Sequence, residues 1–130
     1  MLNVVSSLDW KSLTRAAELD LCGDAIEVRF ADGRIQRLQV TDDAAGTIRV
    51  WTVGSRRAEI EEVKNPRLYA WLRNRLVDLV DFRIDREGRM IGEASIATPE
   101  LTADEWALYI RTVASASDRL EYLLTGQDSE

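Results

Sequence analysis

A long apolar stripe near the C-terminus constrains the fold of this chain more than any other feature. Its large side chains recur with the spacing of one helix face: Trp106, Ile110, Val113, Leu120 and Leu124. The segment Thr102–Glu105 before them has capping-box spacing, and Gly126 after them is typical of a helix end. A helix with such a stripe must bury it. We therefore expect this helix to pack on a sheet formed by the rest of the chain.

An alternating pattern predicts a first hairpin for that sheet. Residues 26–30 alternate apolar and charged side chains, as a half-buried strand does. Ala31-Asp32-Gly33 supplies a tight turn, and residues 35–40 form the return strand. The apolar positions Ile35 and Leu38 break strict alternation, which predicts a β-bulge in the return strand.

Three further strands are expected downstream. Residues Thr47–Val53 are rich in β-branched and aromatic side chains. Residues 82–84 and 90–96 predict a second hairpin, whose turn at Asp85–Gly88 ends in a glycine suited to positive φ.

Two more helices are predicted upstream of the last one. The first is capped by Ser6 or Ser7, continues through Leu8, Trp10, Leu13, Ala16 and Ala17, and ends before Gly23. The second begins at Asn65-Pro66, because proline is tolerated at the first helical position. Its apolar stripe comprises Leu68, Tyr69, Leu72, Leu76, Leu79 and Val80.

The predicted order of elements is α-β-β-β-α-β-β-α, an α+β fold with an antiparallel sheet packed against helices. No repeat, low-complexity tract or Pro/Gly/Ser-rich linker divides the 130 residues. We expect one domain over residues 1–126, followed by a flexible C-terminal end at residues 127–130.

Composition excludes much familiar chemistry. The chain has no histidine and one cysteine, Cys22, so it lacks Ser–His and Cys–His nucleophile pairs, histidine-based metal sites and disulfides. A reactive Cys22 would need a helix terminus or an arginine to lower its pKa, and we interpret it as an ordinary thiol. Glycine-rich phosphate-binding motifs are absent. We expect no cofactor and no metal.

The net charge of −6 works against binding of nucleic acid or anionic membranes. Arg56-Arg57 is a short basic segment without neighbouring aromatic residues, as in a solvated loop. The sequence shows no membrane-spanning apolar run and no signal-peptide pattern, so a cytoplasmic location is expected.

Acidic clusters are the remaining candidates for catalysis. They lie in predicted loops or in a helical first turn: Asp42 with Asp43, Glu59 with Glu61 and Glu62, and Asp104 with Glu105. General acid–base catalysis needs two carboxyls in different environments within a cleft. Loops and helix N-termini instead favour solvated carboxylates. We therefore expect no catalytic residue.

Large apolar residues away from the helical stripes are the more informative candidates. On the second helix, Trp71 lies off the stripe beside Arg67 and Arg75. On the last helix, Leu108 and Tyr122 lie opposite the buried stripe. In the third strand, Trp51 and Val53 occupy the face opposite Ile48 and Val50, so that strand is apolar on both sides. Aromatic residues and arginine are enriched in interface hot spots, which favours partner binding by Trp51, Val53, Arg67, Trp71, Arg75, Leu108 and Tyr122.

Two segments resemble a known family. The hairpin Asp85–Ala94 resembles the D-x-x-G-x-I turn of YbjN-like proteins, and Leu108–Ala114 with Asp118–Gly126 resembles their last helix. The element order is similar to the secretion-chaperone-like fold that the YbjN family shares with class I type III secretion chaperones, over nearly the whole chain. This resemblance implies a small α+β domain that often dimerises and offers an apolar surface to another polypeptide.

The sequence therefore predicts a non-enzymatic protein-binding module, of chaperone or adaptor type, that works as a homodimer and binds another polypeptide. The alternative is a small carboxylate-based enzyme or a small-ligand sensor. A deep pocket holding a perturbed Asp or Glu would favour the alternative, and a broad, shallow apolar patch would favour the binding module.

Overall fold

Six strands form one antiparallel sheet in the order β1-β2-β3-β4-β6-β5. The computed structural model describes residues 9–43, 46–55, 60–61, 63–76 and 79–125. In chain order its elements are α1 (Trp10–Leu13), β1 (Leu19–Cys22), β2 (Ala25–Arg29), β3 (Ile35–Asp42), β4 (Thr47–Ser55), α3 (Pro66–Leu76), β5 (Asp81–Ile84), β6 (Met90–Ala97) and α4 (Ala103–Thr125). The predicted α+β class, with an antiparallel sheet packed against helices, is confirmed. The proposed flexible end at residues 127–130 lies outside the described residues.

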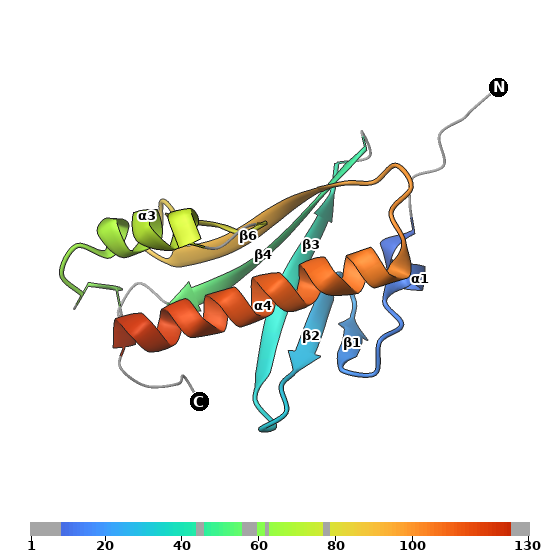
Figure 1. The fold of residues 1–130 in the computed structure, drawn as a ribbon, viewed down its shortest axis with the longest axis horizontal. Coiled ribbons are helices and arrows are strands. Elements are labelled where there is room, and N and C mark those ends of the chain that lie inside the picture. The colour runs from blue at the N-terminus through green and yellow to red at the C-terminus, as the bar shows by residue number, and fades with distance from the viewer. Residues whose placement is uncertain (1–8, 44–45, 56–59, 62, 77–78, 126–130) are drawn as a thin grey trace.

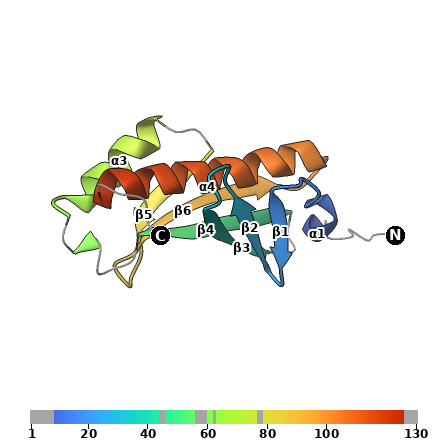
Figure 2. The ribbon, with the colours of Figure 1, turned by 90° about the horizontal axis from the view of Figure 1, so that it is seen from below.

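Both longer helices lie on one side of the sheet. Helix α4 crosses the strands along its whole length, and α3 lies over the end of the sheet formed by β5 and β6 (Figure 1). The view from below shows α3 and α4 together on one side and the strands on the other (Figure 2). The core therefore lies between α4 and one sheet face.

The predicted C-terminal helix is confirmed, including its cap and its buried face. The Glu105 backbone N–H donates to Thr102 Oγ1 at 3.2 Å, and the Thr102 N–H donates to Glu105 Oε1 at 2.9 Å. These reciprocal bonds form the capping box. Four members of the stripe are at most 1% exposed: Trp106, Ile110, Val113 and Leu120.

Helix α4 approaches the sheet closely where the strands carry glycine. A Cβ built on Gly92 of β6 would lie 2.2 Å from Ser117 Oγ of α4 and 3.1 Å from Phe82 Cε1. A Cβ on Gly54 of β4 would lie 3.4 Å from the Ser117 carbonyl oxygen. At Gly92 the Ser117 side chain of α4 therefore occupies the space that a larger residue would fill, whereas Gly54 lies at ordinary contact distance from the α4 backbone.

The first hairpin has the predicted turn but a regular ladder. Strand β3 pairs with β2 without a register shift, from Ala25 opposite Gln39 to Arg29 opposite Ile35. The predicted bulge is therefore wrong. Ile35 breaks the alternation because its side chain is on the face opposite Leu38, where it is exposed.

The N-terminal segment differs from the sequence prediction. Helix α1 has only four residues, and Leu19–Cys22, expected within or just after a helix, forms an edge strand paired with β2. Gly23 with Asp24 makes the connecting two-residue turn, and Gly23 has a φ of +62°. Pairing of Leu19–Cys22 with β2 thus outweighs the local preference of this segment for a helix. The proposed caps Ser6 and Ser7 lie outside the described residues.

The apolar stripe predicted for α3 is only partly buried. Leu68 and Tyr69 are exposed, whereas the small Ala70 is buried. The helix ends at Leu76, and Leu79 has a positive φ of 75°, so the chain has left the helix before it reaches Val80. Because α3 lies at one end of the sheet, the rest of the protein covers a narrower face of this helix than the apolar stripe predicts. The side chains of Leu72 and Leu76 are not among those that the structure describes.

Candidate functional site

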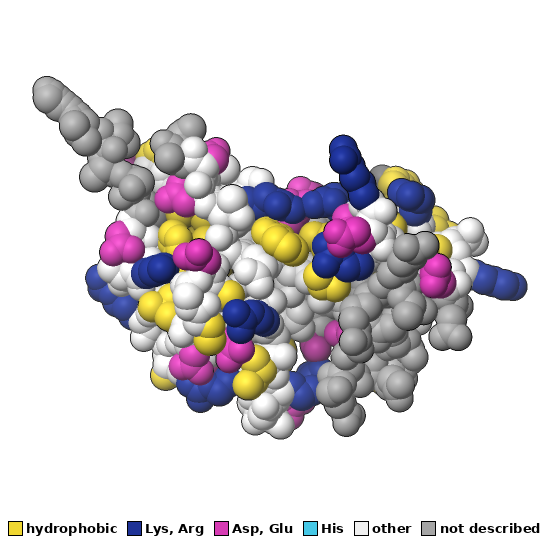
Figure 3. Space-filling model, turned by 180° about the vertical axis from the view of Figure 1, so that it is seen from behind, with side chains coloured by type: hydrophobic (Ala, Val, Ile, Leu, Met, Phe, Trp, Pro, Cys, Tyr) yellow, Lys and Arg dark blue, Asp and Glu magenta, His cyan; other side chains and the backbone are white. Residues whose placement is uncertain are grey.

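The sheet side opposite α4 is the candidate surface, and we call it the open face. Side chains alternate along each strand, so the register identifies the residues directed to this side. They include Asp20, Glu27, Arg29, Ile35, Arg37, Gln39, Thr41, Arg49, Trp51, Val53, Asp81, Arg83, Ile91, Glu93 and Ser95. Among the described residues no helix covers this side, where apolar, basic and acidic side chains intermingle (Figure 3).

Apolar side chains lie near the centre of the open face, on β4 and β6. Trp51 and Val53 are half-buried, and Val53 pairs with Ile91, which is only 1% exposed. The Trp51 indole Nε1 is buried, and it has no hydrogen-bond acceptor within the described part of the chain. Both predicted residues of β4 thus belong to one apolar cluster with Ile91.

A carboxylate between two arginines borders this cluster. Glu93 on β6 accepts hydrogen bonds from Arg49 on β4 and Arg83 on β5. The Arg49 guanidinium also lies over the Trp51 ring, 5.2 Å from its centroid. Burial alone would raise the pKa of Glu93, but the hydrogen bonds from the two arginines outweigh it and hold that pKa below its ordinary value. The carboxylate is therefore a stable anion with a structural role.

The charges of the open face cancel one another. Arg37 Nη1 lies 3.1 Å from Glu27 Oε2, and Arg29 Nε lies 2.9 Å from Asp20 Oδ2. The strand residues of this face include four arginines and four acids: Arg29, Arg37, Arg49 and Arg83, with Asp20, Glu27, Asp81 and Glu93. Their sum is zero, whereas the whole chain carries −6. The strand residues of the open face thus carry no net charge, although the whole chain is acidic.

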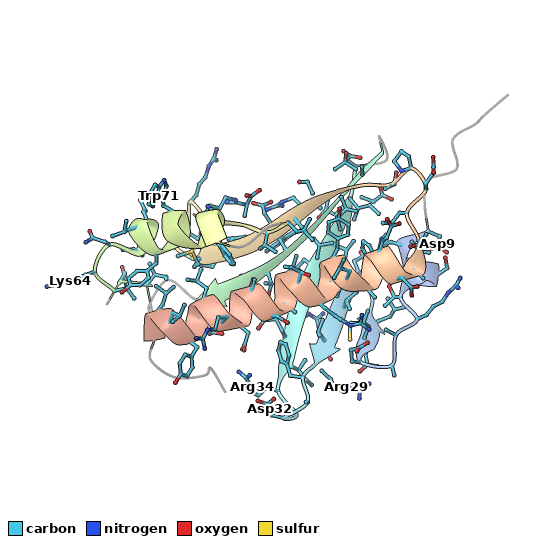
Figure 4. All side chains as sticks on the ribbon, in the orientation of Figure 1. Asp9, Arg29, Asp32, Arg34, Lys64 and Trp71 are labelled. Atoms are coloured by element: carbon cyan, nitrogen blue, oxygen red, sulfur yellow. The ribbon has the colours of Figure 1, made fainter. Side chains whose placement is uncertain are left out.

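The predicted contact residues of α3 lie on a different surface. Trp71 is 54% exposed and projects from α3 on the side away from α4 (Figure 4). Arg67 on the same helix is also exposed. The side chain of Arg75, the third predicted contact residue of this helix, is not among those that the structure describes.

The predicted contact residues of α4 lie on a third surface. Leu108 is 54% exposed, and Tyr122 is exposed with the Arg119 guanidinium 5.7 Å from its ring centroid. Fourteen residues of helix separate Leu108 from Tyr122, about 21 Å along the axis. Both lie across α4 from the sheet, so the structure does not join them with Trp51.

Sequence reasoning missed Arg49, Arg83, Ile91 and Glu93. No local sequence pattern marks any of these four residues as part of a site. They lie close together only because β4, β6 and β5 pair in the sheet. The one available signal was the β6 segment, where Ile91 is apolar on the face opposite Met90 and Ala94.

The described acidic clusters do not converge. Asp42 and Asp43 are exposed at the end of β3, and Asp104 and Glu105 are exposed in the first turn of α4. Glu59, Glu62, Arg56 and Arg57 lie outside the described residues. No group of three His, Cys, Asp or Glu suited to a metal ion occurs within the described ranges, and no helix there is long and apolar enough to cross a membrane.

Comparison with known proteins shows a shared fold. No protein-family model matches the sequence, and curated proteins give no significant match. The structure is similar to the crystal structure of an uncharacterized protein from Methanothermobacter thermautotrophicus, with a TM-score of 0.54 and 14% sequence identity. The similarity covers 87% of this chain and 91% of that chain. At this identity it concerns the fold alone.

Proposed function

We propose that this protein is a non-enzymatic protein-binding module, of chaperone or adaptor type, whose open face receives apolar side chains of a partner polypeptide. The asymmetry of the sheet carries this proposal. One face is covered by α4, whereas the described helices leave the other face uncovered although Trp51, Val53 and Ile35 lie on it. The resemblance to YbjN-like proteins supports the same role, in a cytoplasmic setting and as a homodimer.

The energetics of the open face favour an apolar partner segment. Full burial of a large apolar side chain contributes about 1.5–3 kcal/mol, and Trp51 and Val53 retain part of their surface for that purpose. The charged groups beside them already pair with one another, so a partner needs no compensating charge to dock there. Recognition would therefore depend on apolar contact and tolerate varied partner sequences.

A peptide-binding experiment tests the proposal. The probe is a fluorescein-labelled, uncharged peptide rich in leucine and phenylalanine, compared with its serine-substituted counterpart. Trp51→Glu places a charge where aromatic surface would be buried, which costs several kcal/mol. Since each 1.4 kcal/mol is tenfold in affinity, we expect binding at least tenfold weaker.

Matched variants separate this effect from unfolding and from other surfaces. Trp51→Phe keeps the aromatic ring and should bind normally, as should Leu108→Glu on α4. Circular dichroism establishes that each variant is folded. A folded Trp51→Glu variant that binds like the wild type would contradict the proposal. Loss of binding with Trp71→Glu alone would assign the surface to α3, and loss with Glu61→Gln/Glu62→Gln alone would favour the carboxylate alternative.

A further inference from the structure

The two edges of the sheet differ in how their outward backbone groups are satisfied. On β5, the bond from the Asp85 N–H to the Arg89 carbonyl (2.9 Å) and the pairing with β6 direct the N–H and C=O of Phe82 outward. Asn74 of α3 meets both: its Nδ2 donates to the Phe82 oxygen at 3.0 Å, and its Oδ1 accepts from the Phe82 N–H at 2.7 Å. At Phe82 the carboxamide thus takes the place of a neighbouring strand.

The β1 edge has no such cap. The Arg29 N–H donates to the Glu18 carbonyl at 2.9 Å, so the alternation along β1 directs the backbone groups of Leu19 and Leu21 away from β2. The Leu19 N–H donates to the Ala16 carbonyl at 3.0 Å. Within the described residues, the N–H and C=O of Leu21 have no hydrogen-bond partner, and its side chain is 45% exposed. An uncapped edge with an exposed leucine is a template for strand addition.

We propose that a second copy of this chain occupies this edge, with the two β1 strands antiparallel about a two-fold axis at Leu21. Each Leu21 N–H would then donate to the Leu21 carbonyl of the other copy, and the two exposed leucines would meet on the helix side of the sheet. The inference rests on the self-association included in the proposed function, to which it adds a geometry.

Charge selects this register over the alternative. With the axis at Leu21, Asp20 lies opposite Cys22 of the second copy. A shift that pairs Leu19 with Leu21 places the axis at Asp20, so that two aspartates lie directly opposite, which is destabilising. That shift also requires the Leu19 N–H, which already donates to Ala16.

The dimer would enlarge the partner-binding surface. Directly opposed residues of an antiparallel pair point to the same face of a sheet. The open faces of both copies would therefore lie on one side of a continuous sheet, and both α4 helices on the other. Because the strand residues of the open face carry no net charge, the open faces of two acidic chains can lie side by side without net repulsion between them.

Disulfide trapping tests the register. Directly opposed residues in a hydrogen-bonded pair have Cα atoms about 5.5 Å apart, which suits a disulfide. Leu21→Cys in a Cys22→Ser background should therefore oxidise to a covalent dimer at micromolar concentration, reversed by dithiothreitol. Leu108→Cys in the same background is the control, since Leu108 is similarly exposed, and it should stay monomeric on denaturing gels. Equal cross-linking of both variants, or of neither, would overturn the proposed register.

Sedimentation velocity tests the edge itself. Leu21→Lys places like charges opposite each other and should raise the dimer dissociation constant at least tenfold, whereas Leu108→Lys should leave it unchanged. A wild-type chain that is monomeric at millimolar concentration, or a Leu21→Lys variant that dimerises normally, would overturn the proposal. If Trp51→Glu abolishes the dimer and Leu21→Lys does not, the second copy occupies the open face instead. Peptide binding by Leu21→Lys is measured separately, so failure of the edge leaves the proposed function independently testable.

Discussion

Gly92 should be the strand position least tolerant of an added methyl group. A Cβ there would lie 2.2 Å from Ser117 Oγ and 3.1 Å from Phe82 Cε1, where ordinary contacts are 3.4–4 Å. Overpacking of this kind costs about 1–3 kcal/mol. Alanine is preferred to glycine within strands by about 0.5–1 kcal/mol, which offsets part of the cost. Since 2.2 Å is far inside any ordinary contact, the upper part of the overpacking range, about 2–3 kcal/mol, applies, and we expect Gly92→Ala to lower the free energy of unfolding by about 1–2.5 kcal/mol.

A double-mutant cycle with Ser117 identifies the cause. Ser117 is fully buried, and its hydroxyl has no hydrogen-bond partner among the described residues. Ser117→Ala removes this unsatisfied group and should stabilise the protein by about 1 kcal/mol. It also removes the atom nearest to the new methyl group, so Gly92→Ala should cost at least about 1 kcal/mol less in that background.

Urea denaturation followed by tryptophan fluorescence measures these free energies, with the slope m checked for constancy. Gly54→Ala is the matched control, because its added Cβ would meet Ser117 only at an ordinary 3.4 Å and should change stability little. If Gly92→Ala were as stable as the wild type, or equally costly with and without the Ser117 hydroxyl, the close approach of α4 to β6 at this point would be refuted.

Three further predictions concern the core, the open face and the β5 edge. Leu120→Ala should lower the free energy of unfolding by about 2–5 kcal/mol, and an unchanged urea midpoint would reject burial of Leu120. Because the pKa of Glu93 is held below its ordinary 4.5, the carboxylate stabilises the fold above that pH and loses this effect as the pH falls below it. Glu93→Gln should thus lower urea midpoints more at pH 7 than at pH 3; equal losses would contradict this role. Asn74→Ala should cost about 1–3 kcal/mol by leaving both Phe82 backbone groups unpaired, and Asn74→Asp, which sets a carboxylate oxygen against the Phe82 carbonyl oxygen, should cost at least as much in the same assay; no loss with either variant would contradict this role.

Local patterns in the sequence determined the elements whose signals lie within a few residues. The helical spacing from Trp106 to Leu120, the capping box and the Asp-Gly turn each define their structure through contacts between sequence neighbours. These features were predicted correctly. The apolar character of Trp51 and Val53 on the second face of β4 was also readable, because alternation along one strand is a local property.

Tertiary structure alone decided which segments met. Leu19–Cys22 became a strand because β2 offered a partner at the sheet edge, and Leu68 and Tyr69 stayed exposed because α3 covers only the end of the sheet. The ion pairs of Glu93 with Arg49 and Arg83 depend on strand register, which relates residues up to 44 positions apart. The energy of strand pairing depends on residues of two strands and cannot be read from either strand alone. The charge balance of the open face and the uncapped β1 edge could therefore be recognised only in the folded molecule.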